Sequence, residues 1–494
     1  MGKFNTKAKT GSPKTINRAG GQAYKQTNKL AITSILFTSF LKDQFYRTEK
    51  ETIIVIKNLI ASMSDKKFIA KAAIYARNVF GMRSITHLTA AELAANVRGE
   101  SWLRKFINSV VRRVDDMSEI LAYYIANYGE LNSKKRLAKM PNALRRGLAD
   151  AFSKFTAYHL AKYKMESRDV SLIDLVNLVH PKPTKQNAGA LKALVNGTLG
   201  PADTWESALS KTGQIAEDEE ELKELKSSAW FKLLSENKLG YLAALRNIRN
   251  ICAQSPESMP LLCKVLTNPE SIKKSLVFPY QIIKAQEVVL SEGMNNRQIL
   301  TALNTALELT CKNIPEFTGK TLICLDDSGS MGDLYNNKSP FSMGSLFAAM
   351  LFKSDNDCDL MMFSDDARLV KDINPLDSIA TIRTRIGEHR TSRGTNFHAP
   401  FQRAVKAYDR MIFLSDEQGW IEYDTPVNDL RRYERVYNCK SYIYSWDLSG
   451  YGNMQFPEDR VIALAGFSDR IFDLMRNAET DKSVMLHAIE EIEL

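Results

Sequence analysis

The strongest chemical signal in the sequence is the run Leu325-Asp326-Asp327-Ser328-Gly329-Ser330-Met331. Its D-x-S-x-S spacing lets one carboxylate and two hydroxyls turn toward a single point. Two later segments offer matching oxygens, Gly394-Thr395-Asn396 and Leu414-Ser415-Asp416. Such a set suits Mg²⁺, because that ion prefers octahedral oxygen ligands and retains waters. We therefore predict a site for Mg²⁺ or another divalent cation, formed by Asp326, Ser328, Ser330, Thr395 and Asp416.

Other uses of these side chains remain open. Asp326, Asp327 and Asp416 could form a carboxylate cluster that activates water on the metal, as in a nuclease. Hydrolytic sites usually supply more carboxylates or a histidine, however. A hydroxyl-rich set instead leaves a coordination position for an incoming carboxylate, which is adhesion chemistry. The serines could also merely cap the next helix. We favour a metal site without catalysis.

The ends of strands could position these side chains. The hydrophobic pattern of the sequence after Pro315 predicts a sheet that would supply such strands. Short apolar runs typical of buried strands occur at 321–325, 359–363, 410–414, 440–446 and 461–465. Helical segments alternate with them at 341–352, 376–386, 398–408 and near 469–476. This alternation predicts a parallel, doubly wound α/β domain. Ligands of such sheets bind at the carboxyl ends of the strands, where Asp326 and Asp416 both fall.

From about residue 30 to 310 the hydrophobic periodicity is helical almost throughout. Many medium-length helices without a convincing strand predict an irregular, HEAT-like helical repeat. Residues 1–29 contain seven Lys and Arg but no Asp or Glu, so we expect a flexible basic segment. The predicted organisation is a basic N-terminal segment, a helical-repeat domain and an α/β domain, over 1–29, 30–318 and 319–494.

The net charge of +10 is divided unevenly along the chain. Residues 320–494 hold 20 basic and 28 acidic residues, a net of −8, whereas residues 1–319 hold 47 basic and 29 acidic residues, a net of +18. A surplus of that size is typical of a polyanion-binding surface. Any nucleic acid is therefore expected on the helical part, although a merely solvated surface would carry the same charge.

Several stretches of the helical part interleave basic side chains with apolar ones. Arginines held on rigid helices can bridge phosphates with two hydrogen bonds each, and lysines add point charge. One stretch alone is more often a solvated helix face, but their concentration favours contact with RNA or DNA. The candidate RNA-binding residues are Lys135, Arg136, Lys139, Arg145, Arg146, Lys162, Lys164, His180, Lys182, Arg246 and Arg249.

The cysteine pattern and the termini bear on location. Six cysteines are scattered without a C-x-x-C pair, which favours a reducing compartment over a disulfide framework. No run of about 18 apolar residues indicates a membrane span, and the basic N-terminus lacks the apolar core of a secretory signal. We expect a cytoplasmic protein that does not contact a membrane.

In ordered motifs the sequence resembles the Ro autoantigen family, whose members join a TROVE module of helical repeats to a von Willebrand A domain. The matching motifs include 143–146, 162–164, 178–183, 244–247, 274–280 and 325–331, and Gly20-Gly21-Gln22-Ala23-Tyr24 is similar to bacterial members. The acidic and hydroxyl run resembles the metal-ion-dependent adhesion site of von Willebrand A domains. The segment Arg393-Gly394-Thr395 departs from that pattern, because a second glycine is common where Arg393 stands.

The resemblance implies a fold and a function. The helical repeats would close into a ring against the metal domain, and a basic channel would take single-stranded 3′ ends of misfolded or structured non-coding RNAs. An outer surface would bind Y-like RNA through Lys162, Lys164 and His180. The family implies a scaffold in RNA quality control or processing, with an exoribonuclease as a partner in bacteria. We expect a monomer apart from these partners, and a metal-dependent protein-adhesion scaffold is the alternative.

Overall fold

The chain divides into two compact units, which the computed structural model describes separately. One unit contains residues 1–55 and 311–491, and the other contains residues 56–310 with 492–494. The structure describes residues 14–129, 140–164, 169–202, 204–291, 296–310, 314, 317–336, 338–355, 357–468 and 470–494. We call the units the α/β unit and the helical unit. Both predicted fold classes are confirmed.

A six-stranded sheet forms the centre of the α/β unit, with the strand order β5-β4-β3-β6-β7-β9. All neighbours are parallel except β5, which pairs with β4 in the antiparallel direction. The strands are β3 (Thr321–Asp326), β4 (Cys358–Phe363), β5 (Ala367–Val370), β6 (Arg410–Ser415), β7 (Tyr442–Asp447) and β9 (Ile462–Ala465). Every residue of β3 and β6 is buried, which explains their continuous apolar runs.

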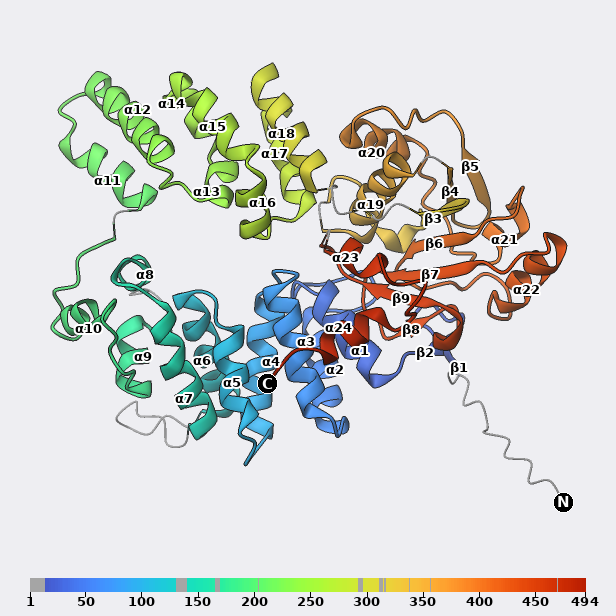
Figure 1. The fold of residues 1–494 in the computed structure, drawn as a ribbon, viewed down its shortest axis with the longest axis horizontal. Helices are drawn as coiled ribbons and strands as arrows, with labels where there is room; N and C mark the ends of the chain where they lie inside the picture. Colours follow the sequence, from blue (N-terminus) through green and yellow to red (C-terminus); the bar gives the residue numbers. More distant parts are fainter. Residues whose placement is uncertain are drawn as a thin grey trace. The chain divides into compact units, whose positions relative to one another are not determined.

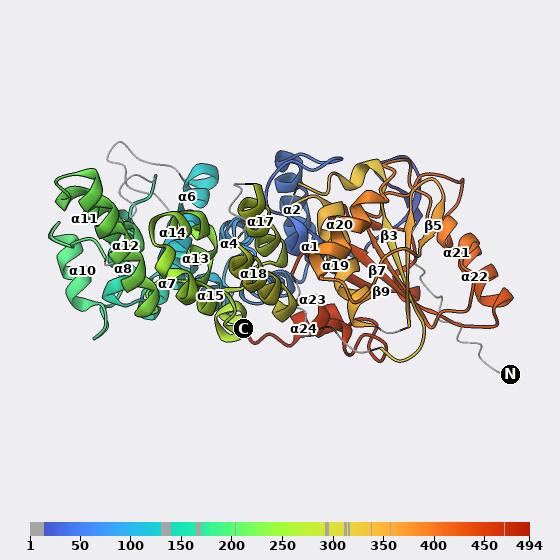
Figure 2. The same ribbon diagram turned by 90° about the horizontal axis from the view of Figure 1, so that it is seen from above.

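Helices cover both faces of this sheet, as the doubly wound prediction requires (Figure 2). On one face Trp446 of β7 stacks on Phe347 at 4.6 Å between ring centroids. On the other face Phe413 of β6 packs against Phe401 at 5.5 Å. The helices of the unit are α1 (Asn28–Thr38), α19 (Pro340–Ser354), α20 (Ile379–Glu388), α21 (Ala399–Arg403), α22 (Val427–Val436), α23 (Ile471–Met475) and α24 (Val484–Glu490).

The N-terminal segment differs from its prediction, because residues 14–25 form a ribbon on the α/β unit (Figure 1). Strand β1 (Lys14–Ile16) pairs with β2 (Gln22–Lys25), and β2 pairs with β8 (Asn453–Met454). The Asn17 side chain stabilises the turn by accepting hydrogen bonds from the backbone N–H groups of Ala19 and Gly21. The prediction of a flexible segment over 1–29 was therefore wrong for this part.

The helical domain predicted from residue 30 does not coincide with a single compact unit. Helix α1 was expected in the helical domain, but it packs on β9 and α24 of the α/β unit. Residues 30–38 of this helix are all buried, and they are mainly apolar, with Thr33, Ser34 and Thr38 as the polar exceptions. The unit boundary falls inside α2 (Glu49–Ser62), between Val55 and Ile56. The boundary near residue 318 lies close to the observed one, since the α/β unit resumes at Cys311.

Gly21 is the position where the ribbon approaches the sheet loops most closely. A Cβ atom there would overlap the carbonyl oxygen of Gly419 and lie 2.5 Å from the Trp420 Cα. We expect Gly21→Ala to lower the free energy of unfolding by about 1–3 kcal/mol, because neither backbone can retreat without strain. Gly200→Ala, at an exposed loop position, is the control, since no atom beyond its chain neighbours lies within 4 Å of the added methyl group. Urea unfolding of both variants measures the difference; equal values would contradict the close approach.

The helical unit contains only helices among its described residues, as predicted. Each helix packs on neighbours one to three positions away in sequence, for example α3 on α5, α5 on α7, and α12 on α15. Figure 1 shows them as successive pairs. They are α3 (Lys66–Asn78), α4 (Ser84–Asn96), α5 (Trp102–Val110), α6 (Val114–Tyr128), α7 (Asn142–Ala151), α8 (Ala157–Lys162), α9 (Leu172–Val179), α10 (Ala188–Val195), α11 (Trp205–Ile215), α12 (Glu219–Ser235), α13 (Tyr241–Arg246), α14 (Ile248–Gln254), α15 (Met259–Leu266), α16 (Pro269–Ser275), α17 (Pro279–Ser291) and α18 (Arg297–Thr310).

A buried ionic network joins α3, α4 and α6. The Asp116 carboxylate accepts hydrogen bonds from Arg77 Nη2 at 2.7 Å and Arg83 Nε at 2.9 Å, and His87 Nε2 lies 3.1 Å away. Burial opposes the ionisation of Asp116, but the His87 hydrogen bond and the Arg77 charge hold its pKa well below the usual value. The network therefore fixes the positions of three helices relative to one another.

Among the described residues, none of the helices is both long and apolar enough to cross a lipid bilayer.

Candidate metal centre and nucleic-acid interface

Two buried carboxylates meet at the carboxyl ends of β3 and β6. These strands are neighbours, with Leu325 opposite Leu414, so Asp326 and Asp416 follow them at the same edge of the sheet. Both side chains are fully buried. Burial raises the pKa of each carboxyl group, and the charge on Asp326 raises that of Asp416 further. Two buried acids that raise each other's pKa favour a proton or a cation beside them.

The hydroxyl groups of the D-x-S-x-S run surround this pair. The backbone N–H of Ser328 donates to Asp326 Oδ1 at 2.9 Å, which turns the run back toward the strand end. The hydroxyls of Ser328 and Ser330 are 3.3 Å apart, and both residues are buried. Ser415, which the sequence analysis did not single out, donates to Asp326 Oδ2 at 2.6 Å. Ser328 therefore orients one oxygen of Asp326, and Ser415 orients the other.

The loop of Thr395 is fastened to both carboxylate loops. The Gly329 N–H donates to the Arg393 carbonyl at 2.9 Å on one side. On the other side, the Thr395 carbonyl accepts from the N–H groups of Trp420 and Ile421 at 3.1 and 3.2 Å. Thr395 itself is buried. The three predicted segments thus converge, and Arg393 points its guanidinium toward Asp365 at 3.3 Å.

Asp416 supplies the observation that fits a metal ion. Its Oδ1 accepts the Gln418 N–H at 3.1 Å, but its buried Oδ2 accepts no hydrogen bond from the described residues. Among all the described residues, no group of three or more His, Cys, Asp or Glu side chains could hold a metal ion. A cation here would be held by two carboxylates and hydroxyls, which is a donor set for a hard ion such as Mg²⁺.

The second acid of the run, Asp327, forms hydrogen bonds to other segments. Asp327 Oδ2 accepts from Arg368 at 2.6 Å and from the N–H and hydroxyl of Thr391 at 2.7 and 2.9 Å. These bonds tie the run to the edge strand β5 and to the loop that leads to Thr395. Oδ2 of Asp327 is therefore engaged in positioning, whereas its buried Oδ1, like Asp416 Oδ2, has no hydrogen-bond partner among the described residues.

The N-terminal segment positions the centre, which the sequence analysis missed. The Arg18 N–H donates to Gln418 Oε1 at 2.9 Å, and Gln418 in turn holds Asp416. Tyr46 lies beside the serine run: burial and the Asp416 charge raise its pKa, and a hydrogen bond with Ser330 lowers it. The motif at 20–24 was the available signal, since Gly21 permits this approach.

The candidate RNA-binding residues lie on α7 to α10 and on α13 and α14. Arg146, His180, Lys182, Arg246 and Arg249 are exposed, and Arg145, Lys162 and Lys164 are half-buried. The structure does not bring all of them together, because α7 to α10 pack among themselves and α13 and α14 pack on later helices. Lys135, Arg136 and Lys139 lie outside the described residues.

Two features of the α7 to α10 region suit a nucleic acid. His180 ends α9 in the left-handed conformation, with φ of 50°, and lines a hollow of about 440 Å³ with Lys192 and Pro183. Nearby in sequence, the Lys162 ammonium lies 5.9 Å from the centroid of the exposed Tyr158 ring. A cation beside an aromatic face can hold a phosphate and stack a base.

The chain therefore belongs to the class of proteins that combine an irregular helical repeat with a von Willebrand A-type unit containing a D-x-S-x-S centre. The TROVE domain family matches residues 22–210 and 198–318, and the Ro60 vWA domain family matches residues 320–478. The chain belongs to the Ro family of RNA-binding proteins, with a TROVE domain followed by a von Willebrand A domain.

A solved structure shares the fold, and two relatives match part of the chain. The Ro (RSR) protein of Deinococcus radiodurans has a similar fold, with a TM-score of 0.57 and 17% identity over 91% of this chain and 100% of that one. Telomerase protein component 1 of Mus musculus is 24% identical over 53% of this chain, and that of Rattus norvegicus is 23% identical over 45%. The chain spans only 13% and 11% of those two relatives.

Proposed function

We propose that this protein is a non-enzymatic scaffold that binds single-stranded ends of misfolded or structured non-coding RNA, and a Y-like RNA, in RNA quality control or processing. Membership of the Ro family supports RNA as the ligand class. An exoribonuclease is the partner that such a scaffold would present with RNA substrates.

The observation that carries the proposal is the distribution of charge within the helical unit. Residues 56–200 contain 24 basic and 11 acidic residues, a net of +13, whereas residues 201–310 contain 12 and 14, a net of −2. The +18 of residues 1–319 also includes +7 from residues 1–55, which belong to the α/β unit. The polyanion surface is therefore assigned to α3 to α10, where Lys162, His180 and Lys182 lie.

Direct binding tests this proposal. Fluorescence anisotropy with a labelled single-stranded RNA, repeated over a series of salt concentrations, should give an affinity that falls steeply with salt, because phosphate contacts release counterions. Crosslinking in cells followed by sequencing would identify the bound RNAs. RNA binding that is absent, or that does not change with salt, would contradict the proposed function. In the same assay, cleavage of RNA with Mg²⁺ that is lost in Asp326→Ala would overturn the non-enzymatic assignment.

The unpartnered Asp416 Oδ2 favours a second function, metal-dependent adhesion to a protein. Asp326, Ser328, Ser330, Thr395 and Asp416 would hold Mg²⁺, which when bound supplies an open coordination position for an incoming carboxylate. Mg²⁺ should then stabilise the wild type, by roughly 2.7 kcal/mol at a concentration one hundred times its Kd. Asp326→Asn should abolish this gain, since one of the two carboxylates loses its charge.

The metal-free state supplies the control for that prediction. Without Mg²⁺, Asp326→Asn should be at least as stable as the wild type, because it removes the repulsion between two buried carboxylates. Asp333→Asn, an exposed acid in the same loop, should keep the full response to Mg²⁺. Thermal unfolding with excess MgCl₂ or EDTA measures both effects. A wild type that does not respond to Mg²⁺ would contradict the metal site.

A further inference from the structure

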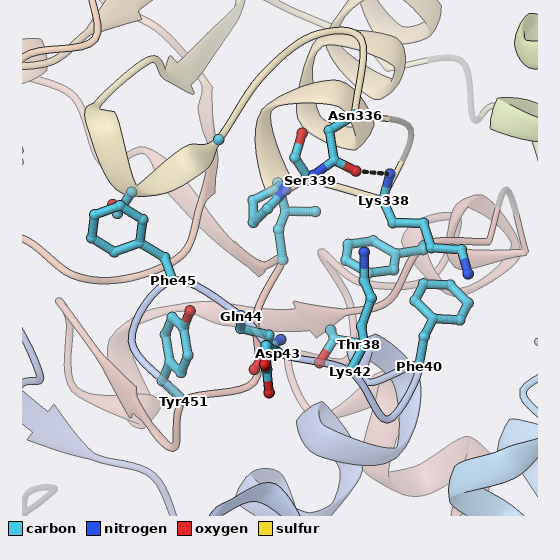
Figure 3. A pocket seen from close by; sticks show the side chains of 15 residues that line it. Thr38, Phe40, Lys42, Asp43, Gln44, Phe45, Asn336, Lys338, Ser339 and Tyr451 are labelled. Carbon is cyan, nitrogen blue, oxygen red and sulfur yellow. Dashed lines mark hydrogen bonds between the residues drawn. The ribbon is translucent and has the colours of Figure 1, made fainter. Parts of the chain in front are cut away.

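A small cavity lies directly beside the candidate metal centre in the α/β unit (Figure 3). Its volume is about 180 Å³, and Ser330 is part of its wall. Residues at the end of α1 and in the segment after it form one side, and the other side is formed by Gly332, Asn336, Lys338, Ser339 and Pro340, before and at the start of α19. Neither loop contributes to the function proposed so far. The cavity and the metal centre share a wall, so one ligand could occupy both.

Two lysines enter this cavity from opposite loops. Figure 3 shows Lys42 rising from the lower loop and Lys338 descending from the upper one. Both lysines line the cavity, where burial lowers the pKa of Lys42 and the charge on Lys338 lowers it further. Among the described residues, no carboxylate forms an ion pair with either one. Two like charges without a counter-charge favour an anion between them.

The acid in the cavity wall does not neutralise these lysines. Asp43 Oδ1 accepts the backbone N–H of Glu49 at 2.8 Å, where α2 begins. Its side chain points away from the two ammonium groups in Figure 3. The wall between the lysines is instead aromatic: Phe40 stacks on Phe467 at 5.5 Å, and Lys338 Nζ lies 5.0 Å from the Phe40 centroid. A ligand with a methylene stem and an anionic end would fit both surfaces.

The size of the cavity identifies the class of ligand. A cavity of about 150 Å³ holds a single benzene ring, so about 180 Å³ accepts one amino-acid side chain. A nucleotide, with its base, sugar and phosphate, is too large. Because the adjoining metal centre would leave a coordination position for a carboxylate, an acidic protein segment fits the cavity and the centre together better than RNA does.

We propose that the cavity lined by Lys42 and Lys338 binds an acidic side chain of a protein partner whose neighbouring carboxylate approaches the metal centre. The inference rests on the adhesion function proposed for that centre and specifies its ligand as a segment with two acidic residues. The lysines select the second acid, and the phenyl rings contact its methylene groups.

The test uses a fluorescein-labelled peptide of alternating glutamate and glycine as the probe, bound to the full chain with Mg²⁺. The double variant Lys42→Gln/Lys338→Gln should bind it at least tenfold more weakly than the wild type, because both cationic partners of the acid are lost. Lys371→Gln/Lys440→Gln, two exposed lysines of the same unit, is the matched control and should bind as the wild type does. Thermal unfolding verifies that both variants fold.

The remaining outcomes separate this inference from the metal proposal. If EDTA has no effect but the Lys42/Lys338 variant still loses binding, the cavity assignment stands and metal-dependent adhesion fails. If EDTA weakens binding but that variant matches the control, the cavity assignment is wrong. A variant that loses affinity for single-stranded RNA, and not for the peptide, would likewise overturn it in favour of a nucleic acid.

Discussion

Asp116→Asn is expected to destabilise the helical unit by about 3–5 kcal/mol, the cost of removing one partner from a buried ion pair. The substitution leaves Arg77 buried without its carboxylate and removes one counter-charge of Arg83. It also weakens the bonds from the backbone N–H groups of Arg112 and Arg113, both 2.9 Å from Asp116 Oδ2. Urea unfolding followed by circular dichroism measures the loss.

An exposed ion pair of the same unit is the control. Arg104 and Asp150 join α5 and α7 at 2.6 Å, but both side chains reach solvent. Asp150→Asn should change the free energy of unfolding little, because an exposed ion pair is only slightly more favourable than the two charges hydrated separately. The low pKa of Asp116 adds a pH signature: its contribution is present above the ordinary value of 3.8 and is lost as the pH falls toward the folded value. If Asp116→Asn and Asp150→Asn lowered the free energy of unfolding equally, burial of the ion pair would not explain the effect.

Removing three cations from the α7 to α10 region should weaken single-stranded RNA binding at least tenfold. The variant Arg146→Gln/Lys182→Gln/Lys192→Gln changes only exposed side chains. If each contacts a phosphate, the slope of log affinity against log salt should fall by about 2, since each contact on a single strand contributes roughly 0.7. Anisotropy titrations at several salt concentrations give both quantities.

Two comparisons make this prediction specific. Arg431→Gln/Arg435→Gln/Lys440→Gln removes the same charge from exposed positions of the α/β unit and should leave RNA binding unchanged. Arg246→Gln/Arg249→Gln tests the later helices, whose segment carries net negative charge, and should have the smaller effect. A larger loss in this double variant would move the RNA-binding surface to α13 and α14.

The sheet and its strand ends could be predicted because their signals are local. A parallel strand buried on both faces is a continuous apolar run, as in Leu322–Leu325, and the acid that follows it marks the ligand edge. Edge strand β5 (Ala367–Val370) gave no such signal, since only its first and last residues are buried. Thr395 and Asp416 could be predicted as metal ligands from their order along the chain relative to the predicted strands. That prediction needed no distances between residues.

The remaining features depend on contacts between residues far apart in sequence. Arg18 and Gln418 are 400 positions apart, and no local pattern predicts their hydrogen bond. A basic, glycine-containing segment reads as flexible when taken alone, and only the partner strand β8 orders it. The mainly apolar sequence of helix α1 indicates that the helix is buried but not which unit it packs against. Lys42 and Lys338 lie on irregular loops, so no periodicity links them.

The pairing of β2 with β8 has a consequence for synthesis of the chain. Gln26 and Asn453 are 427 positions apart, and ribosomes add about 5–20 residues per second, so the first strand must wait roughly 20–90 s for its partner. Residues 56–310 emerge complete in the meantime. The nascent chain is therefore expected to fold its repeat first, while the amino-terminal ribbon remains exposed to proteases and chaperones until strand β8 has been synthesised.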